Sequence, residues 1–340
     1  MGKTLRILFI AFSIVACKQQ KESDLPVSNG LYFGQSIPGN KLEIFAPGII
    51  STGLNEGYIT FSPDGKECYW TILFSDFVTI VTSKLENGRW TKPKVAPFAG
   101  KYYDGWPAIT PDGKRMFFHS SRPVADTTTG ITAKFNVWYV DRTENGWNDP
   151  VVVNAPVNGK ENSTCPSVSM SGNLYISKRF SDGSEKLCRS ELRNGAYQEL
   201  EILPANVNVL KDNYHGYISP DESYLIRICY DRPDNIGAGW NYYISFRKSD
   251  GTWSDLINLG KEVNSVYCGG APSISSDGKY LFFQGIVATG ITDSLDRKSS
   301  LEELIDRDIK SPSMGSTDIY WIDAKIIDEL KPKESLKILK

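Results

Sequence analysis

A strand–turn–strand unit occurs five times along this chain and constrains its fold more than any other feature. The clearest copy is residues 107–121, PAITPDGKRMFFHSS, in which two short strands flank a Pro-Asp-Gly turn. Pro111 suits the second position of a type I turn, and Gly113 can adopt the positive φ that closes it. Four variants of the unit follow the same pattern, at residues 59–65 (ITFSPDG), 166–172 (PSVSMSG), 216–222 (GYISPDE) and 272–278 (PSISSDG).

Each copy continues into the same series of strands. A second strand rich in aromatic residues follows the turn, and a third strand alternates apolar and polar positions. In four copies an Asn-Gly or Asp-Gly pair then precedes a large aromatic residue, at residues 87–90, 145–147, 194–197 and 250–253. These dipeptides mark tight hairpins because both central residues of a type I′ turn need positive φ. Each copy is therefore a four-stranded antiparallel meander, and the sequence predicts an all-β fold, a β-propeller with five blades.

The fifth copy lacks its own fourth strand, because residues 324–330 after its third strand have a helical pattern. Fourth strands elsewhere end 15 to 17 positions before the next turn aspartate or its equivalent, and Pro47 precedes Asp64 by such an interval. We therefore expect an N-terminal strand within residues 42–50 to complete the last blade and close the ring without an open sheet edge. A propeller of six blades, one of them less regular, is the alternative.

Residues 1–16 have the pattern of a signal peptide. Lys3 and Arg6 precede a ten-residue apolar run, which is too short to cross a bilayer. The run ends in Ile-Val-Ala-Cys17, which resembles the lipobox of bacterial lipoproteins. That resemblance implies lipidation of Cys17 and a lipid-anchored protein of the bacterial cell envelope, on the outer membrane or the periplasmic face of a membrane. An ordinary secretory signal is the alternative.

Composition limits the remaining classes of function. Residues 17–41 are predicted to be a flexible tether, 42–330 the propeller and 331–340 a C-terminal tail. Loss of the leader, with its two basic residues, changes the formal net charge from −2 to −4. Without a basic face we expect no nucleic-acid partner, and we expect a monomer.

The cysteines and histidines predict neither a disulfide framework nor a metal site. Five cysteines outside the leader are scattered over separate repeats, so we expect small buried residues, with a Cys229–Cys268 bridge as the alternative. His119 and His215 are the only histidines and form no zinc motif, and no calcium-ligand spacing is present. We therefore expect no metal and no cofactor.

The repeats resemble the TolB-type, WD-repeat-like β-propeller family. The resemblance rests on the Ser-Pro-Asp-Gly-Lys turn at 62–66, the aromatic second strands, Asp-Ile-Tyr at 318–320 and Asn-Gly-Trp at 145–147. Ser171 and Glu222 depart from the turn motif. The family includes periplasmic and envelope adaptors that bind other proteins, and peptidases in which the repeat is fused to a catalytic domain. Because Gly-x-Ser-x-Gly is absent, the resemblance implies an adaptor, although a shared propeller does not carry a shared function.

The two faces of such a propeller differ in composition. The Pro-Asp-Gly turns lie on one face, where Asp64, Asp112, Asp221 and Asp277 are expected to accept backbone hydrogen bonds rather than to perform chemistry. Loops on the opposite face carry acids, aromatic residues and arginines that suit binding of a protein or a sugar. Candidate binding residues on this loop-rich face are Glu56, Asp104, Trp106, Arg122, Glu161, Arg179, Tyr214, His215, Arg232 and Tyr267. Alternatively, these residues only shape the loops and pair with one another.

The sequence predicts a non-catalytic, envelope-anchored protein that binds a protein partner or an envelope component through the loop-rich face. Insertions at 123–134 and 286–316 lengthen loops of that face, and residues 299–306 within the second resemble a short helix. The alternative is a carbohydrate-binding or glycosidase-like propeller. Glycosidases need two facing carboxylates, but the strands that line the channel contain no Asp or Glu. Only the loop acids Glu56, Asp104, Glu161 and Asp212 could serve. A spacer without a specific site is a third reading.

Overall fold

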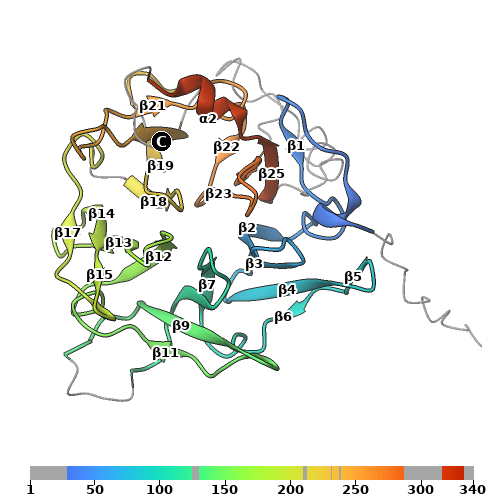
Figure 1. Ribbon diagram of the computed structural model, residues 1–340, viewed down its shortest axis with the longest axis horizontal. Coiled ribbons are helices and arrows are strands. Elements are labelled where there is room, and N and C mark those ends of the chain that lie inside the picture. The colour runs from blue at the N-terminus through green and yellow to red at the C-terminus, as the bar shows by residue number, and fades with distance from the viewer. Residues whose placement is uncertain are drawn as a thin grey trace, which may run out of the picture.

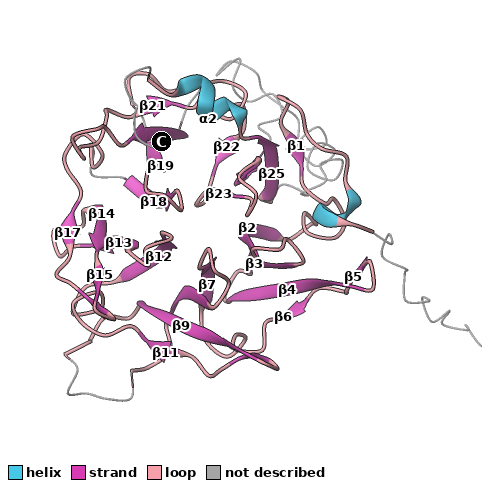
Figure 2. Cartoon of the chain, in the orientation of Figure 1, coloured by secondary structure: helices cyan, strands magenta, loops and turns pink. Residues whose placement is uncertain are grey.

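The computed structural model is an all-β propeller of five blades. It describes residues 29–124, 130–209, 213–230, 232–236, 239–286 and 316–332. Five small antiparallel sheets are arranged as a ring around a common axis, with the first strand of each sheet innermost (Figure 1). The chain passes once around the ring, and its described part consists mainly of strands joined by turns and loops (Figure 2). The predicted fold class is confirmed, and the six-blade alternative is wrong.

The blades follow one another in chain order, each as an antiparallel meander. Blade 1 consists of β2 (Asn55–Phe61), β3 (Glu67–Leu73), β4 (Val78–Glu86), β5 (Arg89–Trp90) and β6 (Lys94–Val95). Blade 2 consists of β7 (Asp104–Ile109), β8 (Arg115–Ser120), β9 (Asn136–Thr143), β10 (Gly146–Trp147) and β11 (Val151–Val152). Blade 3 consists of β12 (Ser163–Val168), β13 (Leu174–Arg179), β14 (Glu185–Ser190), the hairpin β15 (Leu192–Arg193) and β16 (Ala196–Tyr197), and β17 (Glu201–Ile202).

The last two blades complete the ring. Blade 4 consists of β18 (Asn213–Ile218), β19 (Tyr224–Tyr230), β20 (Trp240–Phe246) and β21 (Ile257–Asn258). Blade 5 consists of β22 (Tyr267–Cys268), β23 (Ser273–Ile274), β24 (Tyr280–Ile286), β25 (Asp318–Asp323) and β1 (Glu43–Ile44). Fourth strands are short because the Asn-Gly hairpin and the final ladder pair with different parts of the third strand.

The turn aspartates have the structural role that the sequence predicts. Asp64 Oδ1 accepts hydrogen bonds from the Ser62 hydroxyl at 2.6 Å and from the backbone N–H of Lys66 at 3.1 Å. The same two bonds recur around Asp112, Asp221 and Asp277. Each carboxylate therefore stabilises its own turn, as is usual for Asp at this position.

An N-terminal strand closes the ring, as predicted. Glu43 pairs with Trp321 and Ile44 pairs with Tyr320 in an antiparallel ladder between β1 and β25. Phe45, which is fully buried, follows this ladder and packs among aromatic rings from blades 5 and 1. The first and last parts of the chain are thus held together by the same sheet and the same core cluster.

Residues before the predicted propeller boundary at residue 42 also pack against the propeller. A 3-10 turn, η1 (Leu31–Gly34), buries Tyr32 and Phe33 against the propeller. The Phe33 ring stacks on Trp90 with centroids 4.2 Å apart, and Trp90 Nε1 donates to the Gly30 carbonyl at 2.7 Å. These two aromatic residues, from the segment predicted as a tether, belong to a hydrophobic cluster between blades 5 and 1.

Some of the remaining predictions concern residues that the structure describes, and others concern residues outside them. The helical pattern after the last strand forms α2 (Lys325–Leu330). All five described cysteines are buried and none is in a disulfide, so the alternative Cys229–Cys268 bridge is absent. Cys17, the signal peptide and the predicted helix at 299–306 lie outside the described residues. Within the described part of the chain, no helix has the length and apolar character needed to span a membrane.

Candidate functional site

Equivalent positions in the five repeats form rings of side chains around the propeller axis. The innermost strands β2, β7, β12, β18 and β23 lie next to one another around this axis (Figure 1). Positions at equal distance from the turn residue therefore lie at similar depth along the axis. Two such rings define the candidate site: one six residues before the turn position and one four residues before it.

The ring six residues before the turn closes the channel toward the loop-rich face. Its members are Tyr58, Trp106, Cys165, His215 and Ala271. The first strands of blades 1 to 4 carry a β-bulge here, and Trp106, Cys165 and His215 have positive φ of 54°, 50° and 49°. A bulge re-aims a side chain. Residues from all five blades converge here: four of them belong to one packed cluster, and the fifth, His215, stacks on a member of it.

We call the five residues of this ring the plug; two of them, Trp106 and Cys165, contact both His119 of β8 and His215. The Trp106 ring stacks between His119 and His215, with centroids 4.8 Å and 5.4 Å away. The Cys165 backbone N–H donates to His119 Nδ1 at 3.1 Å, and Cys165 Sγ lies 2.6 Å from His215 Nδ1. Burial raises the pKa of the Cys165 thiol well above its ordinary value and lowers the pKa of His119 to about 3 and of His215 to about 4. A neutral thiol facing neutral imidazoles is packed structure and not an activated nucleophile.

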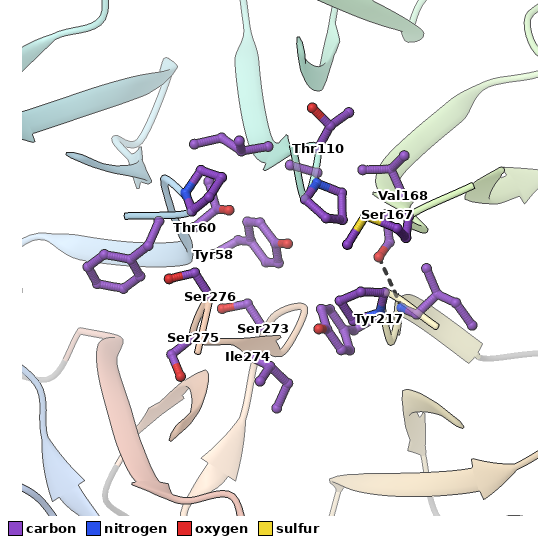
Figure 3. Close-up of a pocket in the computed structure, with 18 residues that line it drawn as sticks. Tyr58, Thr60, Thr110, Ser167, Val168, Tyr217, Ser273, Ile274, Ser275 and Ser276 are labelled. Atoms are coloured by element: carbon purple, nitrogen blue, oxygen red, sulfur yellow. Dashed lines mark hydrogen bonds between the residues drawn. The ribbon is translucent and has the colours of Figure 1, made fainter. Parts of the chain in front are cut away.

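A cavity of about 250 Å³ lies on the other side of this plug, at the tight-turn end of the axis. Its walls are the ring four residues before the turn, and its mouth is the ring directly before the turn. The wall residues are Thr60, Ala108, Ser167, Tyr217 and Ser273, and the mouth residues are Pro63, Pro111, Met170, Pro220 and Ser276. Tyr58 contributes to the cavity from the plug (Figure 3).

Hydroxyl groups dominate the polar surface of this cavity. Those of Tyr58, Thr60, Tyr217 and Ser273 have no hydrogen-bond partner within the described residues, whereas Ser167 Oγ accepts the backbone N–H of Ile218 at 3.0 Å (Figure 3). Burial raises the pKa values of Tyr58 and Tyr217, so both phenols stay protonated and can donate. Among the described lining residues there is no charged side chain. The cavity therefore suits a neutral ligand that both donates and accepts hydrogen bonds.

Asp104 and Arg122, two of the predicted binding residues, form a buried ion pair. Arg122 Nη2 donates to Asp104 Oδ1 at 3.0 Å and to the Phe98 carbonyl at 3.0 Å. Asp104 is fully buried, and only 10% of the Arg122 side chain is exposed. Burial raises the pKa of Asp104, while its hydrogen bonds and the Arg122 charge oppose that shift. This pair joins the first residue of β7 to the segment that follows β8.

Glu56, which lies in β2 of blade 1, is also fully buried. The Thr52 hydroxyl donates to Glu56 Oε1, and Oε2 has no partner within the described residues. Burial raises the pKa of Glu56 to about 7, with a smaller contribution from buried Asp318. The side chain titrates near neutrality without reaching the surface.

The remaining predicted residues are dispersed. Glu161 is half-buried and Arg179 is exposed at the end of β13. Arg232 pairs with Asp234 at 3.1 Å and lies over the Tyr243 ring. The side chains of Tyr214 and Tyr267 lie outside the described part of the chain. Thus Trp106 and His215 meet in the plug and Asp104 meets Arg122, but the described members do not converge on one site.

Sequence reasoning did not select the cavity residues. The sequence contains their signal, because the position four before the turn is small or hydroxyl-bearing in every copy. Nothing in the sequence distinguishes an inward-facing serine that lines a cavity from one that packs in a core. No group of three or more His, Cys, Asp or Glu side chains in the described residues is arranged to hold a metal ion.

Comparisons with known proteins find no family and only distantly similar structures. No protein-family model and no curated protein matches the sequence. Similar solved structures include TolB from Acinetobacter baumannii, at 17% identity over 67% of this chain and 49% of that chain, with a TM-score of 0.43. They also include a GH43 endo-arabinanase from Bacillus licheniformis (12% identity, 81% and 94% covered, TM-score 0.42) and a GH62 hydrolase in complex with xylotriose (12%, 80% and 91%, 0.45). This chain spans about half the length of the TolB protein. Similarities this distant give no argument about function.

Proposed function

We propose that this protein is a non-catalytic binding propeller that holds a neutral polar ligand in the cavity at the tight-turn end of its axis. The observation that carries the proposal is a concave site whose described lining has no charged side chain and has hydroxyls without a hydrogen-bond partner in the described part of the chain. Unpaired polar groups in a preformed concave site are typical of ligand recognition. The proposal places the ligand at the opposite end from the loop-rich face that the sequence favoured.

Two of the loop acids that a glycosidase could use, Glu56 and Asp104, favour binding over catalysis. A pKa of about 7 would suit a general acid, but the Glu56 carboxyl is fully buried and cannot touch a substrate. Asp104 is equally buried and is paired with Arg122. A glycosidase needs two carboxylates that face each other across the substrate. Neither acid lines the described cavity, so we propose no hydrolytic reaction.

The proposed place of action is the bacterial cell envelope, with the ligand an envelope component. The support is the lipobox-like sequence that ends in Cys17 and the resemblance of the repeats to TolB-type propellers. Metabolic labelling with palmitate tests this part separately. We expect label in the native chain and none in Cys17→Ala, and an unlabelled native chain would contradict lipidation.

The binding site is tested by filling the cavity. Ala108→Trp places an indole among the wall residues, while Val151→Trp adds the same group at the exposed outer edge of the same blade. Melting temperatures are measured with and without the neutral low-molecular-mass fraction of an envelope extract. We expect a rise for the native protein and Val151→Trp, and none for Ala108→Trp. An equal rise in Ala108→Trp, or no rise in the native protein, would contradict the proposal.

A further inference from the structure

We infer that the cavity binds the end of a neutral saccharide chain, which enters from the tight-turn face. The inference rests on the proposed function and assigns its ligand class. Three features of the described cavity carry it: a closed floor, hydroxyl-rich walls without charge, and tyrosine rings at two depths.

The closed floor determines how a ligand enters. Tyr58, Trp106 and Cys165 belong to one packed cluster across the axis, so among the described residues the cavity is closed on that side and opens toward the turns. A blind pocket of about 250 Å³ accepts one end of a chain and excludes an internal stretch, which would need two open sides. It lies just below the usual size range of small-molecule sites, roughly 300–1,000 Å³. A terminal sugar fits this description better than a long segment.

The walls suit a polyol. A hydroxyl group donates one hydrogen bond and accepts others, so an array of protein hydroxyls complements an array of sugar hydroxyls in either sense. Thr60 and Ser273 present such groups from blades 1 and 5, and Tyr217 presents one from blade 4 (Figure 3). The phenol rings of Tyr58 and Tyr217 add flat apolar surface that can pack against the C–H face of a sugar ring.

The absence of charge in the described lining selects against acidic sugars. A carboxylate or phosphate that enters the cavity would lose its hydration without gaining a cation. The mouth of the cavity is rigid, because Pro63, Pro111 and Pro220 have restricted backbone angles at three of the five turns. A rigid neutral pocket loses little conformational freedom when a ligand orders.

The test is titration calorimetry of the full chain with neutral linear trisaccharides of glucose, galactose, mannose, xylose and N-acetylglucosamine. We expect at least one trisaccharide to bind, and its uronic acid counterpart to bind at least tenfold more weakly. Tyr58→Phe and Tyr217→Phe each remove one hydroxyl but keep the ring, and each should weaken binding about 2- to 10-fold with an unchanged melting temperature. Ala108→Trp should abolish binding, and Val151→Trp should leave it unchanged.

Stoichiometry tests entry by the chain end. A longer chain of the same sugar should bind one propeller per molecule, as the trisaccharide does. Stoichiometry that rises with chain length, or no binding of any of the trisaccharides, would overturn the inference. If neutral tripeptides bind instead and Ala108→Trp abolishes that binding, the saccharide assignment fails while the proposed binding function stands. If the cavity-filling variant changes no binding at all, both fail.

Discussion

Glu56→Gln should remove a large part of the pH dependence of this protein's stability. The Glu56 carboxyl is fully buried, and burial raises its pKa from the ordinary value of 4.5 to about 7. The unfolded chain therefore releases this proton at a lower pH than the folded chain. Glutamine keeps the shape of a protonated carboxyl and an acceptor for the Thr52 hydroxyl, but it carries no titratable proton.

The magnitude follows from linkage between ionisation and folding. Because the folded pKa is the higher one, stability is fully present below pH 4.5 and is lost as the pH rises through about 7. At about 1.4 kcal/mol for each pH unit, the interval between the two pKa values corresponds to about 3 kcal/mol of unfolding free energy. Buried Glu185, whose pKa is also raised by burial to about 7, contributes a second loss in the same direction. The unfolding free energy of Glu56→Gln should therefore still fall as the pH rises, but less steeply than that of the native protein.

Urea denaturation at a series of pH values from 4 to 9 measures this difference. The native protein should lose stability as the pH rises, and the gap between Glu56→Gln and the native protein should grow by about 3 kcal/mol over that range. Exposed Glu199→Gln is the matched control and should follow the native profile. Parallel profiles for Glu56→Gln and the native protein would refute the argument from burial.

Three further predictions concern stability and are measured by urea denaturation. Arg122→Met leaves the carboxylate of Asp104 buried without its cation and should cost about 3–5 kcal/mol; a cost under about 1 kcal/mol, or no relief when Asp104→Asn is added, would contradict this. Phe45→Ala removes a fully buried ring that joins the closing strand to blades 5 and 1 and should cost about 3–5 kcal/mol, and a near-native midpoint would argue against closure by β1. Glu222→Gly restores the residue typical of this turn and relieves a φ of 57°, but it removes an acceptor of hydrogen bonds from blades 3 and 4; we expect a net loss of about 1–3 kcal/mol, and a more stable variant would show that strain outweighs those bonds.

Much of the fold could be predicted because its signals are local and repeated. A Pro-Asp-Gly turn or an Asn-Gly hairpin needs only its own neighbours, and Asp64 bonds within its own turn as expected. The spacing between Pro47 and Asp64 was enough to assign the closing strand, which pairs with β25. The role of Tyr32 and Phe33 was missed because their partners lie in blades 5 and 1, remote in sequence.

The candidate site was less predictable because its residues come together only when five blades are assembled. Asp104, Trp106 and Arg122 were selected as polar or aromatic groups on loops, yet each is buried by neighbours from other strands or blades. A charged residue in a loop is predicted to be exposed unless its partner is known. The partner of Asp104 is Arg122, 18 positions away in the sequence. The opposite holds for Thr60 and Ser273. In the sequence they are ordinary strand residues, and they line a cavity only because the ring of blades brings them together.

By itself the sequence determined the five repeats, the course of each meander and the strand that closes the ring, since turns and alternation act over a few residues. Only the tertiary structure decided which end of the axis holds a cavity. That choice depends on the bulges that turn Trp106, Cys165 and His215 inward at one depth and on the small side chains, such as Ala108, that leave space at the next. Side chains from separate blades fill the space along the axis, so whether a given depth is packed or hollow depends on all five blades together.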